Sequence, residues 1–173
     1  MSGLTPASKI QADLQNLFQA NLTPGEAYIK FKLTPDITAL LSMERVQKSM
    51  IVETDKITPM PGMPESVIGV MSSSDRVFCV FDLARLLTVS SQAIARRQYQ
   101  IIVLQTTTKT PIYFGLAVAD LQGIIRFSRE KTSSPPQTLL PEIVPYVSKV
   151  LQQTHSVPIL DFERILAAIS SIS

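Results

Sequence analysis

Hydrophobic and polar residues alternate along much of the chain from Ala27 onward, in short runs separated by turn residues. In the first run, YIKFKL at 28–33, apolar residues alternate with two lysines. A second run, ITALLSM at 37–43, follows the turn residues Pro35 and Asp36. Because successive side chains of a strand point to opposite faces, this period of two indicates half-buried strands. The pattern therefore predicts a mainly β fold.

A longer stretch, GVMSSSDRVFCVFDL at 69–83, indicates two strands joined by a polar loop, followed by the start of a helix. We expect the loop to be SSSDR at 72–76, five residues long. The prolines of TPMPGMP at 58–64 remove backbone donors and predict an ordered surface crossing just before this hairpin. Further strands are expected at 50–53, 98–105, 112–119 and 124–127.

The first 26 residues form a separate extension in this interpretation. Residues 8–19 (SKIQADLQNLFQ) predict an amphipathic helix that docks on the body of the protein, whereas a partner-binding arm is the second interpretation. Ser8 begins a sequence that fits a capping box. The apolar residues at helical spacing are Ile10, Leu14, Leu17 and Phe18.

The end of the hairpin is repeated near the end of the chain. VFDLARLL at 80–87 and ILDFERIL at 159–166 share the same order of apolar residues, Asp, Arg and Leu, and a five-residue polar segment precedes each copy. The spacing indicates that one residue has been lost in the second strand of the second copy. This internal similarity predicts two similar β units, each closed by a short helix. Many short strands suit small barrels, because closure removes exposed edges.

The repeated aspartates, Asp82 and Asp161, invite comparison with a catalytic carboxylate pair. Each follows a strand and precedes apolar residues at helical spacing. An Asp in that place accepts hydrogen bonds from the first turn of the helix and favours the positive end of its dipole. We therefore predict that both are structural helix caps.

Composition narrows the classes of function. The net charge of +2 and the absence of Trp argue against a nucleic-acid binder. The single cysteine, Cys79, permits no internal disulfide, and no segment has the pattern of a signal peptide or a membrane span. We expect a cytoplasmic protein.

The sequence offers little catalytic chemistry. One His, one Cys and no clustered carboxylates provide no metal site, and no glycine-rich phosphate loop is present, so no cofactor is expected. A Ser74–His155 pair is conceivable but has no supporting motif. We therefore expect no catalytic residues, and an enzyme is the last of the interpretations.

The run ITPMPGMPESVIGVMSSSDRVFCVFDL resembles the signature of CheW-like domains, the adaptors that couple chemoreceptors to the histidine kinase CheA. That signature has a Pro-rich approach, then Gly-Val-Ile-Asn-x-Arg-Gly, then an apolar strand ending in Asp-Leu. The similarity covers 27–169 and includes the closing ILDFERIL. It implies two SH3-like five-stranded β barrels, which agrees with the duplication and makes 27–173 one CheW-like domain of two intertwined barrel subdomains.

The resemblance also implies candidate binding residues. A kinase-binding surface is implied at Val46, Lys48 and Ser49, and a receptor-binding surface at Ser72, Ser74 and the hairpin tip. This chain departs from the family there, since the signature Asn, Arg and Gly fall on Ser72, Ser74 and Asp75. Serine cannot replace the forked donors of arginine. Arg76 either reaches the same partner from the other arm of the loop or is simply solvated.

The resemblance therefore implies a non-enzymatic adaptor that couples a methyl-accepting type of chemoreceptor to the regulatory domain of a CheA-like kinase. The departures suggest a divergent member, in pilus motility or phototaxis rather than flagellar chemotaxis. The alternative is a self-associating structural module that keeps the fold and has lost receptor contact.

Overall fold

The computed structural model describes residues 25–89, 96–153 and 155–172, and within them the fold is mainly β, which confirms the predicted class. The strands are β1 (Glu26–Thr34), β2 (Ile37–Ser42), β3 (Val46–Glu53), β4 (Val67–Ser73), β5 (Arg76–Asp82), β6 (Gln98–Gln105), β7 (Tyr113–Val118), β8 (Asp120–Phe127), β9 (Thr132–Ser133), β10 (Val147–Gln152) and β11 (Ser156–Leu160).

Helical segments are short. The α-helices are α2 (Leu83–Leu86) and α3 (Phe162–Ser170), and the 3-10 turns are η1 (Met43–Arg45), η2 (Thr54–Lys56), η3 (Arg129–Lys131) and η4 (Val144–Tyr146). The helix expected at 8–19 lies outside the described residues.

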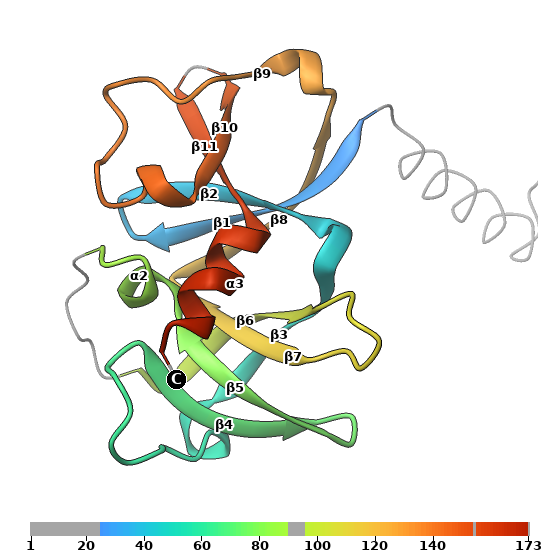
Figure 1. Cartoon of the computed structure of the whole chain (residues 1–173), viewed down its shortest axis with the longest axis vertical. Coiled ribbons are helices and arrows are strands. Elements are labelled where there is room, and N and C mark those ends of the chain that lie inside the picture. The colour runs from blue at the N-terminus through green and yellow to red at the C-terminus, as the bar shows by residue number, and fades with distance from the viewer. Residues whose placement is uncertain (1–24, 90–95, 154, 173) are drawn as a thin grey trace, which may run out of the picture.

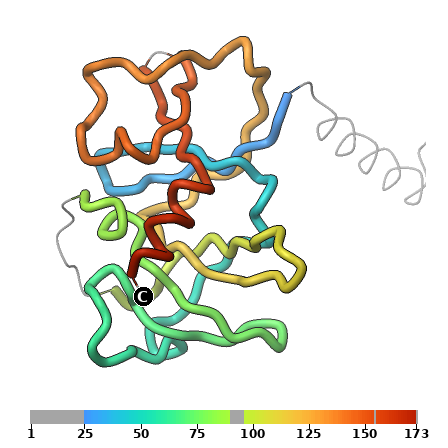
Figure 2. Tube along the Cα trace, in the orientation of Figure 1, coloured from blue at the N-terminus to red at the C-terminus, as the bar shows by residue number. Residues whose placement is uncertain are grey.

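The strands form two sheets that lie one above the other (Figures 1 and 2). The central sheet has the order β3-β6-β7-β5-β4 and comes from the middle of the chain. The terminal sheet has the order β8-β1-β2-β11-β10-β9 and combines both ends of the described chain. The pairing is antiparallel except between β5 and β7 and between β11 and β2. Helix α3 crosses in front of the place where the sheets meet.

The two sheets have the same internal plan, as the sequence duplication predicts. Hairpin β1–β2 corresponds to β6–β7, hairpin β10–β11 to β4–β5, and edge strand β8 to β3. Strands β3 and β8 each pair with the hairpin of the other repeat, so neither sheet is made by one repeat alone.

Both sheets curl into barrels that are closed in a similar way. The bridge between Thr58 and Val70 joins the segment after β3 to β4, and β9 joins the segment after β8 to β10. The two-residue β9 is why the terminal sheet counts six strands rather than five. Gly69 permits the Thr58 bridge, because a Cβ at this position would collide with the Thr58 carbonyl.

Three apolar cores result from the alternation in the strands. Ile29 and Phe31 of β1, with Ile102 of β6, belong to the largest core, at the junction of the two barrels. The opposite faces of these strands, exemplified by Tyr28 and Ile101, fill separate barrel interiors. Burying one such side chain stabilises the fold by roughly 1.5–3 kcal/mol. The strands in the middle of each sheet, such as β1 and β6, are therefore buried on both faces.

Each repeat ends in a helix that covers the junction core. Asp82 Oδ1 accepts from the Arg85 N–H at 3.2 Å, and Asp161 Oδ1 accepts from the Arg164 N–H at 3.2 Å. Both aspartates thus stand at N-cap positions. The apolar face that follows the second cap is anchored by Ile165, which is fully buried in the junction.

Two details differ from the sequence-based expectation. Strand β3 begins at Val46 rather than at residue 50, and exposed residues alternate with half-buried ones along it. The residue missing from the second repeat is absent from the hairpin tip rather than from the second strand, since Met71 pairs with Phe78 and Leu151 with Val157.

Candidate interaction surface

The turn of the β4–β5 hairpin is shorter than the five residues expected from the sequence. Ser73 pairs with Arg76, so only Ser74 and Asp75 lie outside the strands. Their φ angles are 53° and 63°, the left-handed values that a two-residue type I′ turn requires. Asp tolerates this conformation better than most residues, which explains how the turn forms without the glycine of the family signature.

Lys48 brings the two predicted binding sets together. It extends from β3 to the hairpin turn, where its Nζ donates to Ser73 Oγ at 2.7 Å and to Ser74 Oγ at 3.2 Å. Lys48 was assigned to the kinase-binding set and Ser74 to the receptor-binding set. The structure therefore makes them neighbours on one surface.

Arg76 is not simply solvated. Its guanidinium carbon lies 4.0 Å from the centroid of the Tyr113 ring, in the first position of β7. A cation over an aromatic face contributes about 0.5–1 kcal/mol at an exposed site. Together with the Lys48 contacts, this pair occupies the mouth of the central barrel at the hairpin end.

The remaining predicted residues differ in accessibility. Ser49 and Ser72 are exposed. Val46 is only half exposed and packs against the junction core. A charged substitution at Val46 would therefore disturb folding as well as binding, so Ser49 is the better residue for a test of this surface.

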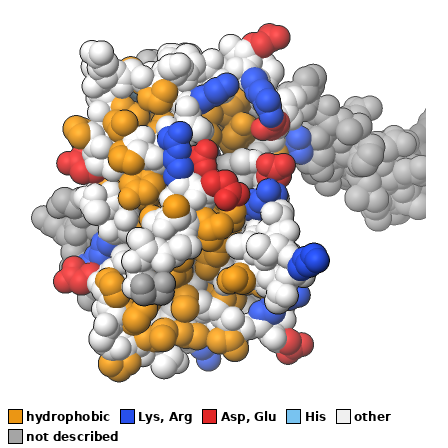
Figure 3. All heavy atoms as spheres, viewed as in Figure 1, with side chains coloured by type: hydrophobic (Ala, Val, Ile, Leu, Met, Phe, Trp, Pro, Cys, Tyr) orange, Lys and Arg blue, Asp and Glu red, His pale blue; other side chains and the backbone are white. Residues whose placement is uncertain are grey.

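An apolar surface beside the hairpin was not predicted from the sequence. Val77 is 72% exposed and Ile112 is 62% exposed. The parallel register that pairs Cys79 with Phe114 places these two residues side by side, Val77 near the start of β5 and Ile112 just before β7. The sequence contained a signal for this surface. Phe78 and Val80 are buried on one face of β5, so Val77, which alternates with them, must lie on the other face. Figure 3 shows hydrophobic side chains gathered over the part of this face where β4, β5 and α3 lie.

The surface around the hairpin carries charges of both signs. Lys48 and Arg76 are close to Asp75 in the turn, and Arg45, the last residue of η1, has its guanidinium 5.9 Å from the Phe162 ring centroid. The Phe162 ring in turn stacks on Phe114 at 5.9 Å. Apolar contacts edged by cations suit a partner that offers apolar and acidic side chains.

The shortest ion pair among the described residues is on the terminal barrel. Arg129 Nη2 lies 2.8 Å from Glu26 Oε1, and the Tyr28 hydroxyl donates to Glu26 Oε2 at 3.1 Å. The hydrogen bonds from Arg129 and then Tyr28 hold the pKa of Glu26 below its usual value. Burial and the bond to Glu26 raise the pKa of Tyr28. The pair ties the start of β1 to η3.

The structure does not bring Ser74 and His155 together. Ser74 lies at the β4–β5 tip of the central sheet and His155 precedes β11 of the terminal sheet. Among the described residues, no cluster of His, Cys, Asp and Glu could hold a metal ion. In the same residues, no helix is long and apolar enough to cross a membrane.

Two small β barrels joined by a shared apolar core define the fold class of this chain. Residues 29–170 match the family model of the CheW-like domain, so the chain belongs to the CheW-like domain family. Proteins of this family are, in general, non-enzymatic scaffolds of chemotaxis signalling.

Among solved structures, the chain resembles the scaffolding protein TtCheW from Thermoanaerobacter tengcongensis, with a TM-score of 0.64. The two are 17% identical, and the match covers 80% of this chain and 85% of the other. At this identity the likeness shows the fold. A search of curated proteins found no match.

Proposed function

We propose that this protein is a cytoplasmic, cofactor-free adaptor that couples a chemoreceptor to a CheA-like histidine kinase. The pathway is chemotaxis, phototaxis or pilus-based motility. The observation that carries the proposal is the hairpin end of the central barrel, where apolar Val77 and Ile112 are exposed on one face of the sheet and the cations Lys48 and Arg76 lie on the other. An apolar centre gives affinity, and the polar edge selects the partner.

The kinase contact is assigned to Val46, Lys48 and Ser49 on β3. Ser49 supplies the exposed part of this surface, while Val46 fixes the strand on the junction core. The regulatory domain of the kinase is the partner for this side.

The receptor contact is assigned to Ser72, Ser74 and Arg76, and Val77 is added because it lies opposite Ser72. Ser72 pairs directly with Val77 across the hairpin, so their side chains share a face. The signature arginine is replaced by Ser74, but Lys48 brings a cation to the Ser74 hydroxyl from the other side of the barrel mouth. This contact supports a receptor surface that has kept its positive charge by a different route.

Binding measurements with the purified full chain test both assignments. Calorimetry against the kinase regulatory domain and against a receptor cytoplasmic tip compares wild type with Ser49→Arg and Val77→Asp. We expect Ser49→Arg to weaken kinase binding at least tenfold and leave receptor binding intact, because the large charged side chain blocks one side only. Val77→Asp is expected to do the reverse.

Ser156→Asp is the matched control, because Ser156 occupies in β11 the place of Val77 in β5. It should leave both affinities unchanged. If the wild-type protein binds neither partner, the coupling proposal is wrong; if Ser49→Arg binds both normally, only the kinase surface is misplaced.

A self-associating structural module is the second candidate function. It is favoured by apolar residues exposed on one edge strand of each sheet, Ile51 on β3 and Ile124 on β8. Such edges can pair with another copy. Sedimentation of the wild type beside Ile51→Lys and Ile124→Lys distinguishes the adaptor from the structural module. The structural module requires a wild-type oligomer that these substitutions dissociate into monomers.

A further inference from the structure

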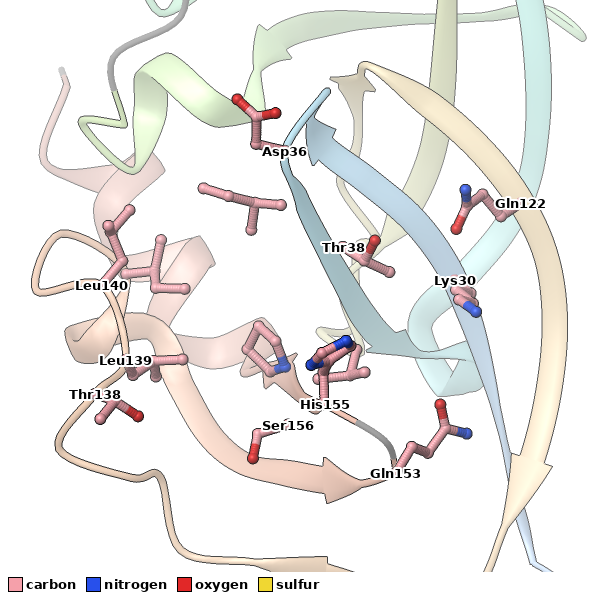
Figure 4. Close-up of a pocket in the computed structure, with 14 residues that line it drawn as sticks. Lys30, Asp36, Thr38, Gln122, Thr138, Leu139, Leu140, Gln153, His155 and Ser156 are labelled. Atoms are coloured by element: carbon pink, nitrogen blue, oxygen red, sulfur yellow. The ribbon is translucent and has the colours of Figure 1, made fainter.

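The terminal barrel has an open groove at its hairpin end. Its volume is about 670 Å³, within the range of protein ligand sites. Leu139, Ile143 and Val157 contribute apolar lining, and Lys30 and His155 contribute polar groups. In Figure 4, Lys30, Gln122 and Gln153 lie on one side of the groove, Leu139 and Leu140 on the other, and His155 between them.

The corresponding end of the central barrel is filled by the protein itself. There Arg76 covers Tyr113, and Lys48 bonds to the hairpin turn. In the terminal barrel the place of Tyr113 is taken by the much smaller Thr38, as the registers of the two hairpins show. The groove therefore exists because large side chains that close one barrel are missing from the other.

The lining selects the chemistry of an occupant. Most of the surface is apolar, and among the described residues Lys30 is the one lysine or arginine that lines it, with Asp36 located at the turn between β1 and β2. A complementary segment would present several aliphatic side chains and one carboxylate on a single face.

We propose that this groove binds residues 8–19 of the same chain. In a helical arrangement, Ile10, Asp13, Leu14 and Leu17 fall on one face, because residues three and four apart are neighbours. That face has the required composition: three aliphatic residues around one carboxylate. Asp13 pairs with Lys30, and the aliphatic residues pack on the apolar lining.

The connection is long enough for the segment to reach its own groove. Lys30 lies four residues along β1 from Glu26, a distance of roughly 13 Å in a strand. Residues 20–25 can span up to about 20 Å when extended. Docking in this way makes the groove a site that the chain occupies itself and that an acidic, amphipathic segment of a partner would have to compete for. The inference does not depend on the coupling function.

Hydrogen exchange of the full-length protein, followed by mass spectrometry, tests the proposal. We expect amides of residues 8–19 to exchange about tenfold or more slowly than in the isolated peptide, because docking protects them. Leu14→Asp, Asp13→Arg and Lys30→Glu should each remove this protection. The double variant Asp13→Arg, Lys30→Glu should restore it, since the charge pair is rebuilt in reverse.

Lys32→Glu is the matched control, because Lys32 is the next lysine on β1 and does not line the groove. It should leave the protection unchanged. Exchange of β1 and β6 amides in the same samples reports whether each variant is folded. Lack of protection in the folded wild type would overturn the proposal, as would protection that survives Lys30→Glu or that increases with protein concentration, which indicates a second copy as the occupant.

Discussion

The hairpins β4–β5 and β10–β11 share one plan from their base almost to their tips. In each, the second strand continues into a helix capped by an aspartate, and equivalent residues such as Phe78 and Val157 point into the barrel. At the tips they diverge. The central hairpin keeps the two-residue turn that binds Lys48, whereas the terminal hairpin is one residue shorter and lines an open groove.

The contrast extends to the outer face of each hairpin. Val77 is 72% exposed on β5, while Ser156 holds the equivalent place on β11. Duplication has thus preserved the positions that build the barrels and the helix caps. The positions that face other molecules have changed, so the two barrel ends have become different surfaces.

The largest expected effect is on the free energy of unfolding, and it distinguishes the interiors of the two barrels. Phe78→Ala should destabilise the protein by about 3–5 kcal/mol, because Phe78 is buried in the central barrel. Val157→Ala should cost only about 1 kcal/mol, since Val157 is partly buried at the groove and loses two methyl groups. Urea unfolding of the full chain measures both. Equal losses would show that the terminal barrel is packed as densely as the central one.

The two helix caps should contribute equally to stability. Asp82→Ala and Asp161→Ala are each expected to lower the free energy of unfolding by about 1 kcal/mol, because each leaves a first-turn N–H without its acceptor. Thermal and urea unfolding report the change, with Asp→Asn at each position as the control that keeps a cap. A loss at one site much greater than at the other would mean that the repeats differ at their bases too.

The smallest effect concerns the ion pair between Glu26 and Arg129 of the terminal barrel. The folded-state pKa of Glu26 is lowered, chiefly by its bond to Arg129, so this pair stabilises the fold above the ordinary value near 4.5 and the contribution is lost as the pH falls below it. Wild type should therefore be slightly more stable than Glu26→Gln at pH 7, and the difference should vanish in acid. Urea unfolding at a series of pH values measures it; a difference that persists at low pH would assign the effect to something other than the charge.

The sequence predicted the strands well where apolar periodicity was strong. Ile29, Phe31 and Leu33 do share a buried face, and the repeated VFDLARLL and ILDFERIL do end similar units. Periodicity is a local signal, however, and could not show that β3 pairs with β6 and β8 with β1. Those pairings are decided by burial across the whole junction.

The candidate surface was less predictable for a related reason. The contact of Lys48 with Ser74 joins residues 26 positions apart, and the Arg76–Tyr113 contact joins residues farther apart still. No local pattern reports such contacts. The left-handed turn at Ser74 and Asp75 was also hidden, because neither residue is the glycine or asparagine that usually marks it.

The exchange of strands between the repeats has a mechanical consequence. The chain crosses between the barrels through η1, from Met43 to Arg45, and again through Ala119, the single residue between β7 and β8. Because both connections are short and both lie beside one continuous apolar core, neither can act as a hinge. The barrels should therefore turn as a single rigid body, so that a displacement imposed at one end of the molecule is delivered at the other with its direction and size preserved.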